Sequence, residues 1–265
     1  VLERVMKFRL WSRVFLCCPV ILSFFLFTIA QDDTKAREVV KEAIKAMGGR
    51  IYLQVQNSHS QGWYYTFDGR GRTRKFSRFQ DWTVYEPIKW RFQLGKDEKR
   101  REVTIYNLEI EKGWTLEGET HVEEISNDVV QRFIRVAAQD MDVIFRKRLD
   151  EEGMNLYYYG PQDVAGSGEY EAVEFLDTTN GSIVVFFDLK THLPSKWETY
   201  RTNQSGVRQK HEQELYKWHT IQGVHVPLRY DSFVDGKKTE QRELETIYFN
   251  IDIPPEYFLQ PSFQK

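Results

Sequence analysis

The sequence predicts an α+β protein in which one large, curved antiparallel sheet forms an incomplete barrel, with helices covering its concave side. Three observations predict this class. Short segments of alternating apolar and polar residues recur along most of the chain, hairpin turns separate them, and only two stretches have helical spacing of apolar residues. No Pro- or Ser-rich linker divides residues 31–265, so we expect a single domain there.

Residues 1–30 have the pattern of a cleavable secretory signal peptide. Basic residues precede an uncharged, mostly apolar stretch at residues 14–29, and Thr28-Ile29-Ala30 offers small side chains for cleavage. An uncleaved anchor stays open as an alternative, although a membrane span needs about 20 apolar residues. Both cysteines lie in this segment, so residues 31–265 contain no disulfide and no thiolate metal ligand.

The composition limits the classes of partner. The formal net charge is −2, and without residues 1–30 the chain is more acidic still, which argues against nucleic-acid binding. Aromatic residues make up 15% of the chain. Such a fraction favours broad sheets that bury large side chains, or an apolar cavity.

Two amphipathic helices are predicted. Apolar residues of the stretch 36–47 recur at i, i+3, i+4 and i+7, Asp32 or Asp33 supplies the N-cap, and Gly48-Gly49 ends the helix. The second helix is expected over residues 126–148. Its apolar side carries Val129, Val130, Phe133, Ile134, Ala137, Met141, Ile144 and Phe145.

Strands are predicted for the rest of the chain. Turn signals such as Asn180-Gly181 and Asp235-Gly236 are typical of hairpins. Ile183–Phe187 is apolar at every position, so both faces of that strand must be covered, either by the protein's own helix and sheet or by a ligand. The alternating sets include Trp63/Tyr65/Phe67, Ile88/Trp90/Phe92/Leu94, Val224/Val226/Leu228/Tyr230 and Leu244/Thr246/Tyr248.

No motif nominates an enzyme. The chain has no HExxH zinc motif and no GxSxG nucleophile turn, and its histidines lack the i, i+4 spacing of zinc ligands. We therefore predict no catalytic residue, no metal and no cofactor. A secreted hydrolase that uses an acid pair in the mouth of the barrel is the weakest of the alternatives, and a raised carboxyl pKa in a cleft would support it.

A basic run, "RGRTRKFSR", places Arg70, Arg72, Arg74 and Arg78 on one face of a strand. Two interpretations stay open. The charges protect an edge strand from pairing with another chain, or they contact anionic lipid head groups or an acidic partner at the mouth of a cavity. In the second case Arg72 and Arg74 are candidate polar residues of the mouth.

Several stretches, in this order, resemble the LolA/LolB-like family of periplasmic lipoprotein carriers and outer-membrane lipoprotein-sorting proteins. The resemblance extends over nearly all of residues 34–265. The stretches that carry it are "KAMGG", "EPIKWRFQ", "YNLEIEKGW", "YYYGPQDVAGSGEYEAVEF", "VVFFDLKTHLPSKWE", "IQGVHVPLRY" and "FNIDIPPEYF".

The resemblance implies an incomplete β-barrel with an apolar cavity for the acyl chains of a lipid or lipoprotein. It further implies a monomeric, non-catalytic bacterial protein of the periplasm, moving cargo towards the outer membrane between an inner-membrane transporter and an outer-membrane receptor. Arg91 is the possible counterpart of a cavity arginine in the family. The cavity side chains would be Trp63, Tyr65, Phe67, Trp90, Phe92, Phe133, Ile134, Met141, Val185 and Phe187. The alternative is an envelope scaffold or interaction protein whose barrel is filled by its own side chains.

Overall fold

The computed structural model describes residues 33–262, apart from residues 96, 165–167 and 204. The predicted signal peptide lies outside the described residues. Among the helices of the described part, none combines the length and the apolar character needed to cross a bilayer.

The strands form one antiparallel sheet of thirteen strands with the order β6-β5-β4-β3-β2-β1-β13-β12-β11-β10-β9-β8-β7. Strands that pair in the sheet also follow one another in the chain, with one exception. The first strand, β1, pairs with the last strand, β13. The strands are β1 (Asn57–Phe67), β2 (Thr73–Tyr85), β3 (Ile88–Leu94), β4 (Glu102–Asn107), β5 (Lys112–Glu117), β6 (His121–Glu124), β7 (Asn155–Val164), β8 (Gly168–Leu176), β9 (Ser182–Asp188), β10 (Pro194–Thr202), β11 (Arg208–Ile221), β12 (Val224–Val234) and β13 (Lys237–Phe249).

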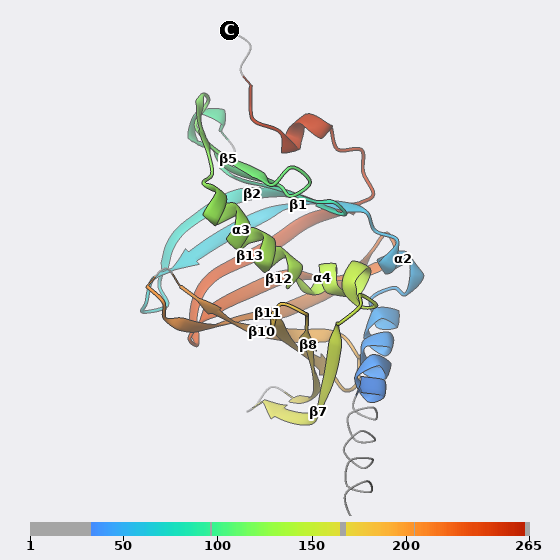
Figure 1. The fold of residues 1–265 in the computed structure, drawn as a ribbon. Helices are drawn as coiled ribbons and strands as arrows, with labels where there is room; N and C mark the ends of the chain where they lie inside the picture. Colours follow the sequence, from blue (N-terminus) through green and yellow to red (C-terminus); the bar gives the residue numbers. More distant parts are fainter. Residues whose placement is uncertain (1–32, 96, 165–167, 204, 263–265) are drawn as a thin grey trace, which may run out of the picture.

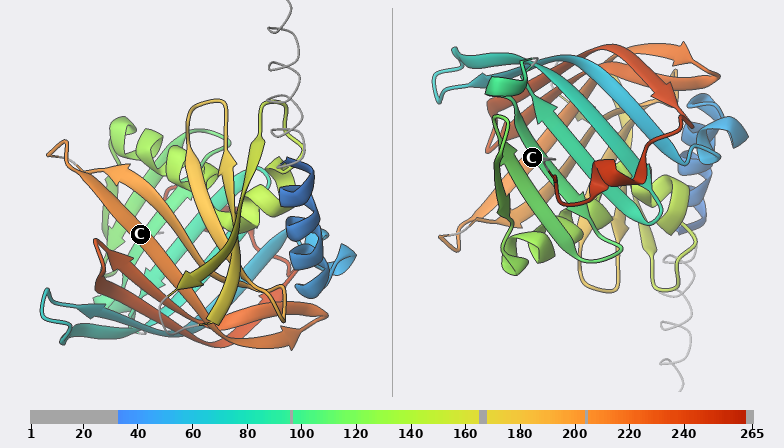
Figure 2. Two further views of the ribbon diagram at one scale, coloured as in Figure 1. Left: turned by 90° about the horizontal axis from the view of Figure 1, so that it is seen from below. Right: turned by 90° about the horizontal axis from the view of Figure 1, so that it is seen from above.

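The sheet curves strongly but does not close, since β6 and β7 are its two edges in the described part of the chain. Helices α3 (Asn127–Ala138) and α4 (Met141–Val143) lie across the concave side (Figure 1). The short helix η3 (Pro255–Phe258) crosses the convex face (Figure 2), and η1 (Glu98–Arg100) lies between β3 and β4. This confirms the predicted open α+β architecture.

The first predicted helix is present at residues 33–46 and is called here the N-terminal helix. It ends at Gly48-Gly49, where both residues have positive φ (120° and 59°). Gly48 is also required for space, because a Cβ there would lie 2.5 Å from the carbonyl oxygen of Gly223. The short helix α2 (Arg50–Leu53) follows and leads into β1.

The prediction of one helix over residues 126–148 is wrong. Helix α3 stops at Ala138, and Asp140 adopts an extended conformation (φ −68°, ψ 133°). Its side chain accepts a hydrogen bond from the Val143 backbone N–H (3.1 Å) and so starts a new turn, α4, which continues as the π-helix η2 (Ile144–Arg148). The break occurs because an N-cap interaction replaces the helical hydrogen bonds of this turn.

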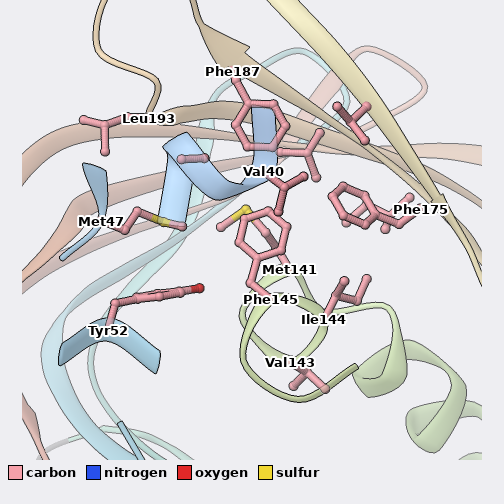
Figure 3. Close-up of a cluster of buried hydrophobic side chains, with 14 of the residues drawn as sticks. Val40, Met47, Tyr52, Met141, Val143, Ile144, Phe145, Phe175, Phe187 and Leu193 are labelled. Carbon is pink, nitrogen blue, oxygen red and sulfur yellow. The ribbon is translucent and has the colours of Figure 1, made fainter. Parts of the chain in front are cut away.

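The main core fills one end of the barrel. The N-terminal helix packs there against η2 and strands β8 and β9, with Val40 among Phe145, Phe175 and Phe187 (Figure 3). Both faces of the apolar strand β9 are covered by the protein itself. Ile183, Val185 and Phe187 are buried in this core, while on the other face the ring of Phe186 is covered by Lys196, whose Nζ lies 4.5 Å from the ring centroid.

Candidate functional site

The other part of the barrel is hollow. A cavity of about 620 Å³ lies between the concave face of the sheet and helices α3 and α4. Its wall includes side chains from β1–β3 and β10–β13, which the β1–β13 pairing brings into one surface. The aromatic residues of the wall are Tyr52, Tyr85, Trp90, Phe133, Trp197, Trp218, Tyr230, Phe233 and Phe249.

Helix α3 covers the cavity through an aromatic contact. Phe133 stacks on Tyr106 of β4 with ring centroids 3.8 Å apart, and on Trp90 of β3 at 5.4 Å. Only Val130 and Ala137 of this helix are buried. Phe133 therefore joins α3 to the sheet and forms part of the cavity wall at the same time.

At the base of α4, Arg146 fixes the cavity wall to α2. Its guanidinium lies 4.0 Å from the ring centroid of Tyr52 and 4.6 Å from that of Tyr85, and it donates to the carbonyl oxygen of Tyr52 (3.0 Å). It also pairs with Asp142 (3.4 Å), whose carboxylate accepts a hydrogen bond from the Tyr52 hydroxyl. Burial opposes the charge of Arg146, but Asp142 raises its pKa above the ordinary value.

A second polar group lies on the strand wall. Asp81 of β2 is buried and accepts hydrogen bonds from Thr83 (3.0 Å), the Trp90 indole (3.2 Å) and Arg242 (3.2 Å). Burial raises the pKa of Asp81, while the charge of Arg242 acts in the opposite direction. These bonds compensate part of the cost of removing the carboxylate from water.

Arg201 and His211 line the cavity on neighbouring strands β10 and β11. The Nε atom of Arg201 is buried and has no hydrogen-bond partner in the described chain. Burial lowers the pKa of Arg201, and burial together with the Arg201 charge lowers the pKa of His211. The cavity wall is thus mixed aromatic and charged, whereas the sequence led us to expect an apolar one.

Only some of the residues predicted to line the cavity do so. Trp90, Phe133 and Met141 are in its wall. Phe92 is next to Trp90 (ring centroids 5.5 Å apart) but outside the wall, and Ile134 of α3 is also outside it. Val185 and Phe187 are fully buried in the main core and do not reach the cavity.

The aromatic residues of β1 lie elsewhere. Trp63 and Tyr65 are on the convex face, because Ser58 and Ser60 of the same strand line the cavity and side chains alternate. The indole of Trp63 donates to Glu245 (2.9 Å). Phe67 contacts Lys238, whose Nζ lies 4.8 Å from the ring centroid.

The predicted polar candidates also lie outside the cavity wall. Arg91 is on the convex face, where its guanidinium is 5.2 Å from the ring centroid of Tyr257 and donates to the Tyr257 carbonyl oxygen (3.2 Å). It therefore holds the C-terminal segment on the sheet. Arg72 pairs with Asp68 in the β1–β2 turn (2.8 Å), and Arg74 is exposed on β2.

Sequence reasoning did not place charged residues in the cavity, and those it missed include Asp81, Asp140, Asp142, Arg146, Arg201, Glu240 and Arg242. For Arg201 one signal was present, since "KWETYR" alternates Trp197, Thr199 and Arg201 on one face of a strand. Within the described residues, His, Cys, Asp and Glu side chains do not gather in any group of three or more that could hold a metal ion.

The comparisons with known proteins concern the fold. No family model and no curated protein matches the sequence. Among solved structures, a DUF1329 family protein from Desulfovibrio piger matches with a TM-score of 0.55 and 11% identity, over 84% of this chain and 96% of that one. A LolA superfamily protein from Nitrosomonas europaea matches with a TM-score of 0.54 and 11% identity, over 85% and 97%.

The class that the sheet and its covering helices define is an open, LolA-like α+β fold. The resemblance noted in the sequence is confirmed at this level. At 11% identity, the likeness shows a shared fold and leaves the function to be argued from the cavity.

Proposed function

We propose that this protein is a non-catalytic carrier that binds the acyl chain of a lipid or lipoprotein in the cavity beneath α3. The observation that carries the proposal is the hollow half of the barrel, with its volume of about 620 Å³ and its aromatic wall. Sites for small molecules commonly enclose about 300–1,000 Å³ and combine apolar walls with a few polar groups. This cavity has a volume in that range, and its wall combines aromatic side chains with charged groups.

A carrier of acyl chains requires such a cavity because acyl chains are unfavourable in water. Each CH₂ of an acyl chain exposed to water costs about 0.8 kcal/mol, so a carrier must replace water by protein along most of the chain. A carrier must also release its cargo. Helix α3 suits this requirement because it is attached mainly through Phe133, Val130 and Ala137 and can move without disturbing the main core.

The proposal extends to location and partners. Export by the N-terminal segment would place residues 31–265 in the periplasm of a bacterium as a monomer. There the protein would accept cargo from an inner-membrane transporter and pass it to an outer-membrane receptor. The exposed Arg74 and the neighbouring Arg70 on the β1–β2 hairpin are candidates for contact with anionic lipid head groups.

Mass spectrometry tests the carrier proposal. Residues 31–265 are purified from the periplasm without detergent and measured natively and after organic extraction. We expect a lipid or an acylated protein in stoichiometric amount. A protein that is empty and also takes up no fluorescent fatty-acid probe would overturn the proposal and favour the envelope scaffold.

A cavity-filling variant locates the binding. Val136 of α3 lines the cavity, whereas Arg135 beside it is exposed. Val136→Trp should reduce the co-purified lipid and weaken probe binding about tenfold or more, because its indole occupies the space of several CH₂ groups. Arg135→Trp adds the same side chain outside the cavity and should bind as the unmodified protein does. Equal binding by both variants would exclude this cavity as the site.

A further inference from the structure

Most charged side chains of the cavity wall form an ion pair or a hydrogen bond with another side chain. The pairs are Asp81 with Arg242 (3.2 Å), Asp142 with Arg146 (3.4 Å) and Glu240 with the Tyr64 hydroxyl. The carboxylate of Glu212 points to the other face of the sheet, where it pairs with Lys196 (3.2 Å) and Lys210 (3.0 Å). Two charged residues of the wall remain outside these pairs, Arg201 and Asp140.

These two residues are not equivalent. Asp140 accepts a hydrogen bond from the Val143 backbone N–H at the start of α4, and burial together with the charge of Asp142 raises the pKa of Asp140 to about 6. Arg201 makes no hydrogen bond and no ion pair with the described part of the chain, and its Nε is shielded from solvent, although the residue as a whole is partly exposed. The acidic group whose charge acts on Arg201 is Asp140, which forms no ion pair with it. A partly buried guanidinium whose Nε–H has no acceptor is unfavourable, so an anionic partner from outside the chain would stabilise it.

The surroundings of Arg201 define what that partner is. Trp197 and Arg201 both line the cavity from β10, and between them Thr199 is buried and donates to the Ser182 carbonyl oxygen (2.6 Å). His211 lies opposite Thr199 on β11. The planar fork of a guanidinium is suited to two oxygen atoms of one carboxylate or phosphate group. Trp197 and Trp218 both line the cavity and offer aromatic surface to an acyl chain.

We infer that Arg201 binds the anionic head group, a carboxylate or a phosphate, of an amphiphile whose acyl chain occupies the cavity. The inference rests on the proposed carrier function and deepens it by naming the class of cargo. It assigns the charged end of the cargo to the β10–β11 side of the cavity. A neutral amphiphile of equal chain length would leave the guanidinium without a partner and would therefore bind more weakly.

The experiment compares the affinities of an acid and of its methyl ester for the delipidated protein. The probes are dansyl-labelled undecanoic acid and its methyl ester, measured by fluorescence titration at neutral pH. We expect the acid to bind about 10- to 100-fold more tightly, the range of a hydrogen bond to a charged group. Unlabelled lysophosphatidic acid and monoacylglycerol of one chain length, used as competitors, distinguish a phosphate from a carboxylate head group.

Two arginine variants locate the preference. Arg201→Gln should bind acid and ester alike, at the affinity of the ester for the unmodified protein. Arg208 is a matched control, since it lies on the same hairpin with its guanidinium exposed over the Tyr200 ring (4.2 Å). Arg208→Gln should keep the full preference. Retained ester binding shows that each variant is folded.

The outcomes separate the two proposals. Binding of neither probe would contradict the carrier function itself. Equal binding of acid and ester by the unmodified protein, or an unchanged preference in Arg201→Gln, would overturn only the head-group assignment. Asp140→Asn is a further check, since it removes the acidic group whose charge acts on Arg201. It should keep or strengthen the acid preference, whereas loss of the preference would overturn the assignment of the head group to Arg201.

Discussion

The N-terminal helix and α3 have similar amphipathic patterns but different environments. In the N-terminal helix, Ala36, Val39, Val40 and Ala43 are at most 4% exposed and pack into the main core. In α3 only Val130 and Ala137 are buried, and Phe133, Val136 and Ala137 line the cavity. The N-terminal helix thus fills its half of the barrel, whereas α3 covers the cavity.

The difference shows how one open sheet combines stability with binding. The filled half, with β8, β9 and the N-terminal helix, has the dense packing that resists unfolding. The hollow half has less such packing, and its contacts include ion pairs within the wall and the stacking of Phe133 on Tyr106, which joins α3 to the sheet. We therefore expect substitutions in the two halves to affect different properties.

The largest expected effect comes from placing one charge in each half. Val40→Asp inserts a carboxylate among Phe145, Phe175 and Phe187 (Figure 3), and an uncompensated buried charge costs about 3–5 kcal/mol. Val136→Asp makes the same change on α3, facing the cavity, where we expect less than about 1 kcal/mol. Urea unfolding measures both free energies.

Probe binding completes this comparison. Val136→Asp should weaken binding of the neutral methyl-ester probe, because the carboxylate keeps water in the cavity. Val40→Asp, where it still folds, should leave probe affinity unchanged. Equal losses of stability in the two variants would show that the α3 side of the barrel is packed as tightly as the core.

Much of the sheet was predictable because hairpins depend on local chemistry. Asn180-Gly181 and Asp235-Gly236 lie at the β8–β9 and β12–β13 turns, and Asn180, Asp235 and Gly236 have the positive φ that such turns require. The break in the second helix was missed. Its apolar pattern continues without interruption from Ala137 into Met141, so only the N-cap role of Asp140 marks the break.

The site was less predictable, for two physical reasons. Alternation shows that a strand has two faces, but not which face is concave. On β1 small serines line the cavity, and the large Trp63 packs on the convex face against Arg78, 4.8 Å from the ring centroid. The charged wall depends on contacts between distant segments, such as Asp81 with Arg242, which one sequence does not reveal.

A smaller effect is expected from removing one arginine on each side of the helix break. The Arg146 side chain is only 1% exposed, and it contacts Tyr52, Tyr85 and Asp142. Arg146→Gln should lower the free energy of unfolding by about 2–3 kcal/mol, through lost cation–π contacts and an unpaired tyrosine carbonyl. Arg132 pairs with Asp128 on the exposed side of α3, and Arg132→Gln should cost about 0.5 kcal/mol or less.

The salt dependence of stability distinguishes the contacts of Arg132 from those of Arg146. The exposed Arg132–Asp128 pair is screened by added salt, whereas the buried Arg146 contacts are screened much less. The stability difference between Arg146→Gln and the unmodified protein should therefore persist at high ionic strength. A difference that vanishes there would mean that solvent reaches Arg146, and that the base of α4 is open.

The smallest effect tests how α3 is held. Phe133→Leu keeps an apolar side chain but removes the stacking on Tyr106 and Trp90, which is worth about 1 kcal/mol beyond the buried area. Global stability should change little, since the main core is untouched. Hydrogen exchange should nevertheless accelerate in the amides of residues 130–138 and remain unchanged in the N-terminal helix, because the two helices open independently. Equal acceleration in both helices would contradict the division into a filled and a hollow half, since it would mean that α3 opens only when the whole barrel unfolds.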